Sequence, residues 1–382
     1  MQPLKDILDD AAVRALARDL GRAHPRLDAR SFVAAGLAGL AERSLSERAI
    51  HLADVMHAHL PADFAAAAEL VEASLGAPLA GSEVFGMEVL RYLPHVHFVA
   101  RHGLDHFEPS MRLQLALTRR FSAEFSIRAF LLKYPERTYE RLVAWTADPD
   151  VHVRRLVSEG TRPRLPWAER LRDYQRDPTP VLALLERLKD DPERYVQRSV
   201  ANNLNDIAKD HPQRVLDVCA RWRQGAGAGR TWIVGHALRS LIKQGDRGAL
   251  ALVGAAEPPR VRVREVRFEP PAITLGDTLR LAFELVSTSA APQELVVDYA
   301  VHFVKADGQR RPKVFKLRRL TLPPRAAVPL AARVSFADMT TRKHYPGAHR
   351  AELLVNGEAL PLGEFEVRAA TRAAAPRRPA PR

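Results

Sequence analysis

A repeat of 43 residues constrains this chain more than any other feature of its sequence. The segments DPDVHVRRLVSEG, which starts at Asp148, and DPERYVQRSVANN, which starts at Asp191, align without gaps. Aspartate caps helices and proline suits the first helical turn, so the shared Asp-Pro start predicts a helix in each copy. A period near 43 residues is typical of HEAT-type solenoids, in which helix pairs bury their apolar faces against neighbouring pairs. Chance similarity between amphipathic helices is the alternative, and the shared Asp-Pro start argues against it.

Helical spacing of apolar residues extends through residues 1–257. Segments such as AAVRALARDLGRA and SERAIHLADVMHAHL place apolar residues three and four positions apart, with proline or glycine between segments. A second echo relates YPERTYERLVAW (134–145) to HPQRVLDVCARW (211–222), which share proline, arginine and the final tryptophan. We therefore predict an all-α HEAT-like-repeat solenoid over residues 1–257, with one concave surface exposed.

The periodicity changes after residue 257. Seven segments, from VRVREVRF to LGEFEVRA, alternate apolar and polar residues or are rich in β-formers. Asn356-Gly357 between two of them is a strong hairpin signal. These features predict an all-β immunoglobulin-like sandwich over residues 258–368, here without a Cys–Trp–Cys core. Residues 369–382, which end in RRPAPR, are predicted to be a disordered basic tail.

The net charge of +13 indicates a polyanionic partner, most often nucleic acid. From residue 259 onward the chain has 22 Lys and Arg against 12 Asp and Glu, whereas the preceding residues have 36 against 33. The excess is therefore concentrated in the C-terminal third. An arginine-rich composition from a GC-rich genome, which also favours alanine and proline, is the alternative explanation.

Other features limit the location and the chemistry of the protein. The single cysteine, Cys219, excludes a disulfide framework and fits a reducing cytosol. The N-terminus has acidic residues where a signal peptide needs basic ones, and no apolar run approaches the ~18 residues of a membrane span. The histidines lack zinc-ligand spacing, and GAGAGR (225–230) lacks the features of a phosphate loop. We expect a cytoplasmic protein that uses no membrane, metal or cofactor.

Charged and polar residues recur four positions apart on the predicted helices, which places each set on one helix face. The sets are Glu124 with Arg128; Arg155 with Glu159; Arg198 with Asn202 and Asp206; and Arg239 with Lys243. Because the repeat makes Arg155 equivalent to Arg198 and Glu159 equivalent to Asn202, we expect the rows to lie side by side. Ordinary surface ion pairs, each worth about a few tenths of a kcal/mol, are the alternative.

The segment TRPRLPW, which follows Glu159 and Gly160, ends the helical pattern abruptly. It contains two arginines, two prolines and Trp167. Burial in the core is the commoner use of tryptophan. Beside an acid and several arginines, an indole can instead stack on a base or contact a cation.

Long segments of the chain resemble a known family. FEPSMRLQLALTRRFSAEFSIRAFLLKYPERT, DPDVHVRRLVSEGTRPRLPW and VQRSVANNLNDIAKDHP resemble the AlkC branch of the HEAT-like-repeat alkylation-repair DNA glycosylases, which is related to AlkD. VHFVKADGQRRPKVFKL and KHYPGAHRAELLVNG are similar to the C-terminal Ig-like module of one AlkC subtype. The resemblance covers nearly the whole chain.

This resemblance implies a DNA glycosylase of base excision repair. The family excises cationic alkylated bases such as 3-methyladenine and 3-methylcytosine from bent duplex DNA, without metal or cofactor and without flipping the base into a deep pocket. Such a base already carries positive charge, so no general acid is required. The reaction needs negative charge near the oxocarbenium-like sugar and a group that positions or deprotonates water.

The resemblance also assigns site residues. The family's acids correspond to Glu124, Glu159 and Asp206, of which we expect Glu159 and Asp206 to stabilise the cation or orient water. Trp167 is expected to contact the alkylated nucleotide or its sugar, and Arg155 to hold a phosphate or an acid. The expected DNA-binding residues are Arg162, Arg164, Arg198, Arg239, Lys243, Lys313, Lys316 and Arg318.

The basic β domain suits a clamp that holds the far side of a bent duplex. A solubilising cover for the last helix is the alternative. For the whole chain, the alternatives to an enzyme are a non-catalytic HEAT-repeat nucleic-acid-binding protein and a scaffold. Carboxylates in an arginine-lined stripe favour the enzyme, because a pure DNA binder gains nothing from acids that face phosphates. We expect a monomer that acts on double-stranded DNA.

Overall fold

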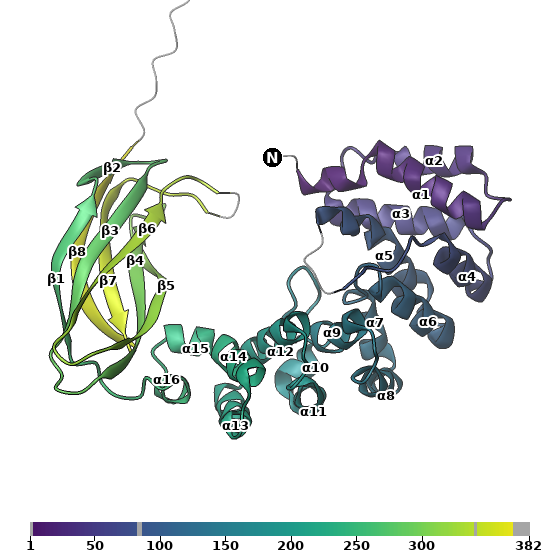
Figure 1. Ribbon diagram of the computed structural model, residues 1–382. Coiled ribbons are helices and arrows are strands. Elements are labelled where there is room, and N and C mark those ends of the chain that lie inside the picture. The colour runs from purple at the N-terminus through teal and green to yellow at the C-terminus, as the bar shows by residue number, and fades with distance from the viewer. Residues whose placement is uncertain (1–2, 82–85, 340–341, 370–382) are drawn as a thin grey trace, which may run out of the picture. The chain divides into compact units, whose positions relative to one another are not determined.

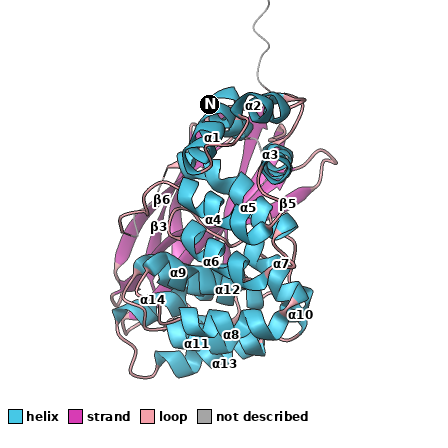
Figure 2. Ribbon diagram, turned by 90° about the vertical axis from the view of Figure 1, so that its right-hand side faces the viewer, coloured by secondary structure: helices cyan, strands magenta, loops and turns pink. Residues whose placement is uncertain are grey.

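The computed structural model describes residues 3–81, 86–339 and 342–369. The chain divides into two compact units, Met1–Ala237 and Leu238–Arg382, which we call the helical unit and the β unit. Figures 1 and 2 show helices throughout the first unit and strands in the second. The tail predicted over residues 369–382 lies, apart from its first residue, outside the described residues.

The described part of the helical unit consists of two short 3-10 helices and fourteen α-helices. They are η1 Leu4–Leu8, α1 Asp10–Ala23, α2 Ala29–Leu37, α3 Leu45–His59, α4 Phe64–Ser74, η2 Met87–Tyr92, α5 Leu93–His102, α6 Phe107–Thr118, α7 Ser126–Lys133, α8 Pro135–Trp145, α9 Val151–Gly160, α10 Arg172–Arg176, α11 Thr179–Leu188, α12 Arg194–Ile207, α13 Pro212–Arg223 and α14 Ala228–Ala237. Within the described ranges, no helix is both long and apolar enough to cross a membrane.

Aspartate side chains cap the N-termini of four described helices of this unit. The carboxylate just before the helix accepts a first-turn amide hydrogen, which has no partner inside the helix itself. Such caps are made by Asp9, Asp28, Asp63 and Asp150.

The two copies of the 43-residue repeat form equivalent structures. Asp148 accepts the main-chain N–H of Asp150 at 2.8 Å, and Asp191 accepts that of Glu193 at 2.9 Å. Each Asp-Pro pair therefore closes a turn just before its helix, rather than capping the helix itself. The two helices that follow, α9 and α12, pack directly against each other.

Helices α8, α11 and α13 lie in one layer and α9, α12 and α14 in a second (Figures 1 and 2). The echo between residues 134–145 and 211–222 corresponds to α8 and α13 of the first layer. In both helices the final tryptophan of the echo, Trp145 or Trp222, is buried. The repeated tryptophans are therefore core residues that anchor this layer.

The described part of the β unit has eight strands and two short helices. They are α15 Arg239–Lys243, α16 Arg247–Leu252, β1 Val261–Glu269, β2 Ala272–Thr274, β3 Thr278–Ser287, β4 Gln293–Val304, β5 Arg310–Leu322, β6 Ala327–Ser335, β7 Gly347–Val355 and β8 Glu358–Arg368. The strands form a three-stranded sheet, β1-β3-β6, and a five-stranded sheet, β2-β8-β7-β4-β5. All pairs are antiparallel except β2 with β8.

Alternate residues of the two sheets form one hydrophobic core. Leu281 and Phe283 of β3 face into it from one sheet, and Val297, Tyr299 and Leu353 from the other. The predicted two-sheet sandwich is thus confirmed. The seven predicted strands correspond to all but β2, which at three residues is too short to show alternation.

The two short helices α15 and α16 belong with the strands rather than with the preceding helices. Asn356 and Gly357 form the predicted hairpin turn between β7 and β8, with positive φ values of 45° and 80°. Gly245, after α15, lies directly against this turn, and a Cβ on Gly357 would lie 2.8 Å from the Gly245 Cα atom. The last described helix, α16, ends at Leu252 and the first strand, β1, begins at Val261, whereas the compact units divide after Ala237.

Candidate functional site

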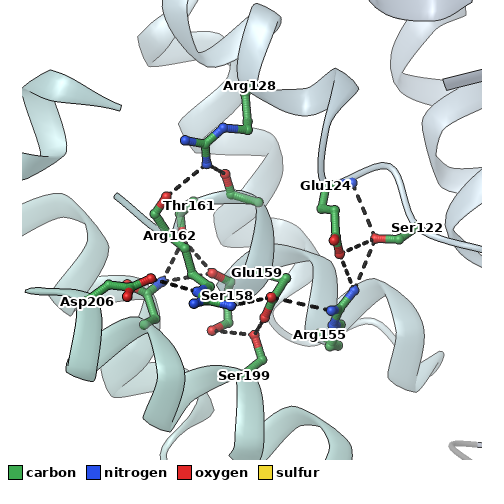
Figure 3. A network of polar contacts seen from close by, with 12 residues as sticks. Ser122, Glu124, Arg128, Arg155, Ser158, Glu159, Thr161, Arg162, Ser199 and Asp206 are labelled. Atoms are coloured by element: carbon green, nitrogen blue, oxygen red, sulfur yellow. Dashed lines mark hydrogen bonds and ion pairs between the residues drawn. The ribbon is translucent and has the colours of Figure 1, made fainter. Parts of the chain in front are cut away.

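Five charged side chains of the helical unit form a continuous chain of ion pairs (Figure 3). In order, they are Glu124, Arg155, Glu159, Arg162 and Asp206, so acids and bases alternate. Their side chains are only 5–17% exposed. Lys209 Nζ, which lies 2.9 Å from Asp206 Oδ1, balances the negative charge that three carboxylates and two guanidinium groups would otherwise leave.

Glu159 lies at the centre of the chain, in the last turn of α9. Its Oε1 accepts from Arg162 Nη1 at 2.6 Å and lies 3.5 Å from Arg155 Nη2. Its Oε2 accepts from the Ser199 hydroxyl at 2.6 Å. Burial alone would raise the pKa of Glu159, but the two guanidinium groups and the Ser199 hydroxyl lower it below its ordinary value. Glu159 is therefore an anion at neutral pH.

Arg155 joins Glu159 to Glu124, which lies just before α7. Its Nη1 donates to Glu124 Oε2 and, at 3.2 Å, to the Ser122 hydroxyl, which donates to the same carboxylate oxygen at 2.8 Å. Burial would lower the pKa of Arg155, but the carboxylates of Glu124 and Glu159 outweigh it and raise the pKa. Tyr195 lies beneath the guanidinium, with 5.2 Å between the ring centroid and Cζ.

A cavity of about 330 Å³ opens beside these residues. Glu124, Arg155 and Glu159 line it together with polar residues of α12. The remaining lining residues are Leu79, Val89, Phe121, Ser122, Tyr195, Arg198, Ser199 and Asn202. The structure thus brings two of the predicted acids and the predicted Arg155 to one concave site.

Small and polar residues allow α9 to place Glu159 there. A Cβ on Gly160 would lie 2.6 Å from Ile127 Cγ2, so only glycine permits this approach of α9 to α7. Asn203 of α12 donates through Nδ2 to the Ser158 carbonyl at 2.8 Å, and Asn205 donates to the Ala237 carbonyl at 2.7 Å. The unusual asparagines of α12 therefore hold neighbouring helices together.

Asp206 lies at the end of the chain and is not among the residues that line the cavity. Its Oδ2 accepts from Arg162 Nε at 2.9 Å, and its Oδ1 accepts from Lys209 Nζ at 2.9 Å. Arg162 itself is buried between Asp206 and Glu159. Contact between Arg162 and a phosphate stays a prediction.

The other predicted phosphate contacts of the helical unit differ from each other. Arg164 forms a two-bond ion pair with Asp210, at 3.0 and 2.6 Å. Arg198 is exposed at the cavity and has no ion pair within the described part of the chain. Of the two, only Arg198 offers a guanidinium group that the protein does not already use.

Trp167 is 75% exposed and has a φ of 66°. Burial in the core, the commoner use of tryptophan, is therefore wrong for this residue. The indole lines a second cavity, of about 430 Å³, together with Phe125, the neighbour of Glu124 in sequence. A non-glycine residue with positive φ and an exposed aromatic ring is unfavourable for folding alone, which is typical of a functional position.

The remaining predicted DNA-binding residues belong to the β unit. Lys313, Lys316 and Arg318 are exposed along β5, an edge strand of the five-stranded sheet. Arg239 and Lys243 lie on α15, and Lys243 Nζ lies 3.5 Å from the Val314 carbonyl oxygen. Arg239 and Lys243 thus belong to a different unit from the charged residues of α9 and α12. The expected placement of these two sets side by side on one surface stays a prediction.

The sequence patterns did not predict Ser122, Tyr195 or Ser199, three cavity residues that contact Arg155 or Glu159. Aligned through the repeat, Ser199 replaces Leu156 and Tyr195 replaces His152. A serine at a position that is apolar in the other copy was a usable signal for a buried polar contact. Within the described residues, no group of three or more His, Cys, Asp or Glu is arranged to hold a metal ion.

Two family models match this chain. A model described as a DNA alkylation repair enzyme matches residues 121–228, which include the whole ion-pair chain. A model described as the C-terminal Ig-like domain of the uncharacterised protein YhaZ matches residues 262–369. The helical unit is thus of the DNA alkylation repair class, and the strands form an Ig-like domain.

Two whole proteins give closer matches. YhaZ of Bacillus subtilis (strain 168) is 40% identical over 270 residues, which are 71% of this chain and 75% of YhaZ. The alkylpurine DNA glycosylase AlkC of Pseudomonas fluorescens, solved bound to DNA containing an abasic site analog, is 42% identical. That structure superposes with a TM-score of 0.89 over 96% of this chain and 100% of the AlkC chain. This chain therefore belongs to the AlkC family of DNA alkylation repair glycosylases, in the form with a C-terminal Ig-like domain. It is a DNA glycosylase, so the alternatives of a non-catalytic binder and a scaffold are wrong.

Proposed function

We propose that this glycosylase removes cationic N-alkylated bases, such as 3-methyladenine and 3-methylcytosine, from duplex DNA in base excision repair. The observation that carries the proposal is the pair of carboxylates, Glu124 and Glu159, at the wall of the 330 Å³ cavity. Arg155 bridges them, and its guanidinium group helps to hold the pKa of Glu159 below its ordinary value. The site therefore offers fixed negative charge to a substrate that develops positive charge.

The chemistry of the substrate explains why this is sufficient. When the C1′–N bond breaks, its electron pair moves to the cationic base, which leaves as a neutral molecule. The positive charge passes to the sugar as an oxocarbenium ion, which ionised carboxylates stabilise electrostatically. Water then adds to C1′ and gives its proton to a carboxylate, which leaves an abasic site.

Each acid has a distinct place in this mechanism. Glu159 stabilises the sugar cation or orients the water, with Glu124 beside it. Asp206 holds Arg162 from behind the cavity wall, so the carboxylates that face the cavity are those of Glu124 and Glu159. Trp167 contacts the alkylated nucleotide or its sugar, which accounts for an indole left 75% exposed.

Phosphate contacts supply the affinity for DNA in this proposal. Arg198 is the best-placed arginine of the helical unit, since it is exposed at the cavity. Lys313, Lys316 and Arg318 of β5 form the clamp of the Ig-like domain. We also interpret the layered helices as HEAT-like repeats that present the cavity on one open face, which suits a monomer on bent DNA without deep base flipping.

The test is release of free base from duplexes that contain a single 3-methyladenine or 3-methylcytosine, in the presence of EDTA. We expect the wild type to release at least one of these bases. Glu159→Gln should lower the single-turnover rate by about 100-fold or more, with DNA affinity little changed. Glu108→Gln is the control, because Glu108 is an exposed acid that pairs with Arg137 and Arg141 and does not line the cavity. No release of either base by the wild type, or full activity of Glu159→Gln, would contradict the proposal.

A further inference from the structure

Arg128 of α7 does not line the cavity, but it holds the loop that follows Glu159. Its Nη1 donates to the main-chain carbonyls of Gly160 and Arg162, at 3.1 and 2.8 Å. Its Nε, at 3.1 Å, and its Nη2 both donate to the carbonyl of Glu169. One guanidinium group thus fixes both ends of residues 160–169, and Figure 3 shows Arg128 beside Thr161 and Arg162.

Only arginine can make this set of bonds. The guanidinium has five N–H groups in a rigid planar fork, whereas lysine has one rotating ammonium group. Four of the five N–H groups of Arg128 are used here. Burial lowers the pKa of Arg128 to about 10, so the group still carries its charge at neutral pH. Two of these carbonyls, those of Gly160 and Arg162 at the end of α9, belong to buried residues and would otherwise lack a donor, whereas Glu169 is exposed.

The loop fixed in this way carries three of the predicted site residues, which are Arg162, Arg164 and Trp167. Arg162, at its start, bonds Glu159 and Asp206. Trp167, near its end, is held outward with a φ of 66°, a conformation that bulky residues adopt only when their surroundings impose it. The orientation of both residues therefore depends on the position of the carbonyls to which Arg128 is bonded.

We propose that Arg128 is a positioning residue for the glycosylase reaction, which acts by fixing the loop that presents Arg162 and Trp167. The inference rests on the proposed function, since it assumes that Glu159 and Trp167 act on the substrate. It adds a residue that touches neither the cavity nor, in this mechanism, the DNA. Its effect should appear in the rate of base release rather than in the affinity for DNA.

The chain contains a matched control for this role. Arg48 of α3 is also buried and also donates to main-chain carbonyls, those of Arg43, Lys5, Leu8 and Ala41. The loops that Arg48 holds contain none of the predicted site residues. Arg48→Lys should therefore have the structural cost of losing such an arginine, without the catalytic one.

The experiment compares Arg128→Lys with Arg48→Lys in the full-length protein, at a temperature well below both unfolding transitions. The readouts are the Tm, the Kd for lesion-containing duplex and the single-turnover rate constant of base release at saturating enzyme. We expect both variants to lower the Tm. Only Arg128→Lys should lower the rate constant, by about tenfold or more, because small misplacements of site residues cost that much. An unchanged rate constant in Arg128→Lys, or an equal loss in Arg48→Lys, would overturn the proposal.

A second variant decides the matter if Arg128→Lys does not fold. Pro166 is exposed and stiffens the middle of the same loop, so Pro166→Gly should loosen it and leave the core intact. We expect a lower rate constant with a Tm lowered by only a few degrees, and a normal rate constant would contradict the inference. Glu159→Gln, measured in parallel, separates the two ideas: if that variant is fully active, the proposed function fails whatever Arg128 does.

Discussion

Charged residues are used differently in the two units of this protein. In the helical unit, Glu124, Arg155, Glu159, Arg162 and Asp206 are largely buried, and each contacts a residue of opposite charge. Along β5, three of the basic residues point into solvent and form no ion pair within the described part of the chain. They are Lys313, Lys316 and Arg318.

The difference indicates two roles: the buried, paired charges suit the chemical step, and the exposed, unpaired charges suit the attraction of DNA. Buried, paired charges are fixed in position and protonation state, which a site needs if it is to stabilise a cation at one atom. Exposed, unpaired charges contribute little to folding, but they attract a polyanion over several ångströms and release its counterions on contact. Substitutions in each set of charges can test this division.

Arg155→Gln should have the largest effect on activity, because Arg155 bridges Glu124 and Glu159. Its loss leaves two carboxylates close together in a partly buried site, which favours protonation of one of them. We expect the single-turnover rate of base release at neutral pH to fall by about 100-fold. The free energy of unfolding should fall by about 3–5 kcal/mol, as is usual when one partner of a buried pair is removed.

The pH dependence of this variant has a definite sign. In the wild type, the pKa of Glu159 is below its ordinary value of 4.5, so its charge and the stability it contributes are complete above that pH. Both are lost only as the pH falls through the lowered value. Without Arg155 the pKa of Glu159 rises, so the acid limb of the rate profile should move to higher pH.

Arg154→Gln is the matched control for both measurements. Arg154 precedes Arg155 on α9 and forms an equally buried ion pair with Asp191, at 2.6 Å, but it does not line the cavity. The Arg154→Gln variant should be less stable than the wild type, but its rate of base release should keep the wild-type pH dependence. The same shift in both variants would mean that the effect comes from damage to α9 and not from the site.

Some contacts of this site could be predicted from the sequence, and others could not. Residues four apart on a helix share a face, so the pair of Arg155 and Glu159 could be predicted from spacing alone. Arg162 and Ser199 could not, because their contacts with Glu159 depend on how the loop after α9 folds back and how α12 packs. Spacing along one element carries no information about either.

For the fold too, periodic patterns in the sequence predicted the elements but not all of their contacts. Helical periodicity and strand alternation identified every long element of the β unit and the change between the two patterns. They did not show that α15 and α16 pack with the strands, since that depends on a contact between Gly245 and Gly357, which lie 112 positions apart. Such close backbone approaches leave no periodic pattern in a sequence.

A double variant of β5, Lys316→Ser with Arg318→Ser, should have an intermediate effect. The two side chains are exposed on an edge strand, so their loss should leave the Tm nearly unchanged. We expect the affinity for duplex DNA at moderate salt to fall by about tenfold, and the slope of log K against log salt to decrease by about two. The rate constant at saturating enzyme should stay normal.

The control for β5 removes the same charge from the other sheet. Arg262 of β1 and Arg333 of β6 are also exposed, and the double variant Arg262→Ser with Arg333→Ser changes the net charge equally. A loss of affinity confined to the β5 variant would assign the contact to that strand. Equal losses in both would mean that only the overall charge of the β unit matters.

The smallest effect on function, with a clear effect on folding, is expected for Gly357→Ala. Gly357 has a φ of 80°, and a Cβ there would lie 2.8 Å from Gly245 Cα and 3.2 Å from Leu250 Cδ1. The free energy of unfolding of the β unit should fall by about 1–3 kcal/mol, the usual cost of overpacking. The rate of base release by folded protein should not change, because the substitution touches neither the ion-pair chain nor β5.

Gly308→Ala separates the two causes of that loss. Gly308 also has a positive φ, of 74°, but a Cβ there would meet no atom within 4 Å, so the variant measures backbone strain alone. Amide hydrogen exchange locates the difference between the variants. If α15 and α16 are fixed to the β7–β8 turn, Gly357→Ala should increase exchange in these helices and Gly308→Ala should not. Equal exchange in both would mean that α15 and α16 do not depend on this contact, and that the β unit begins with its strands.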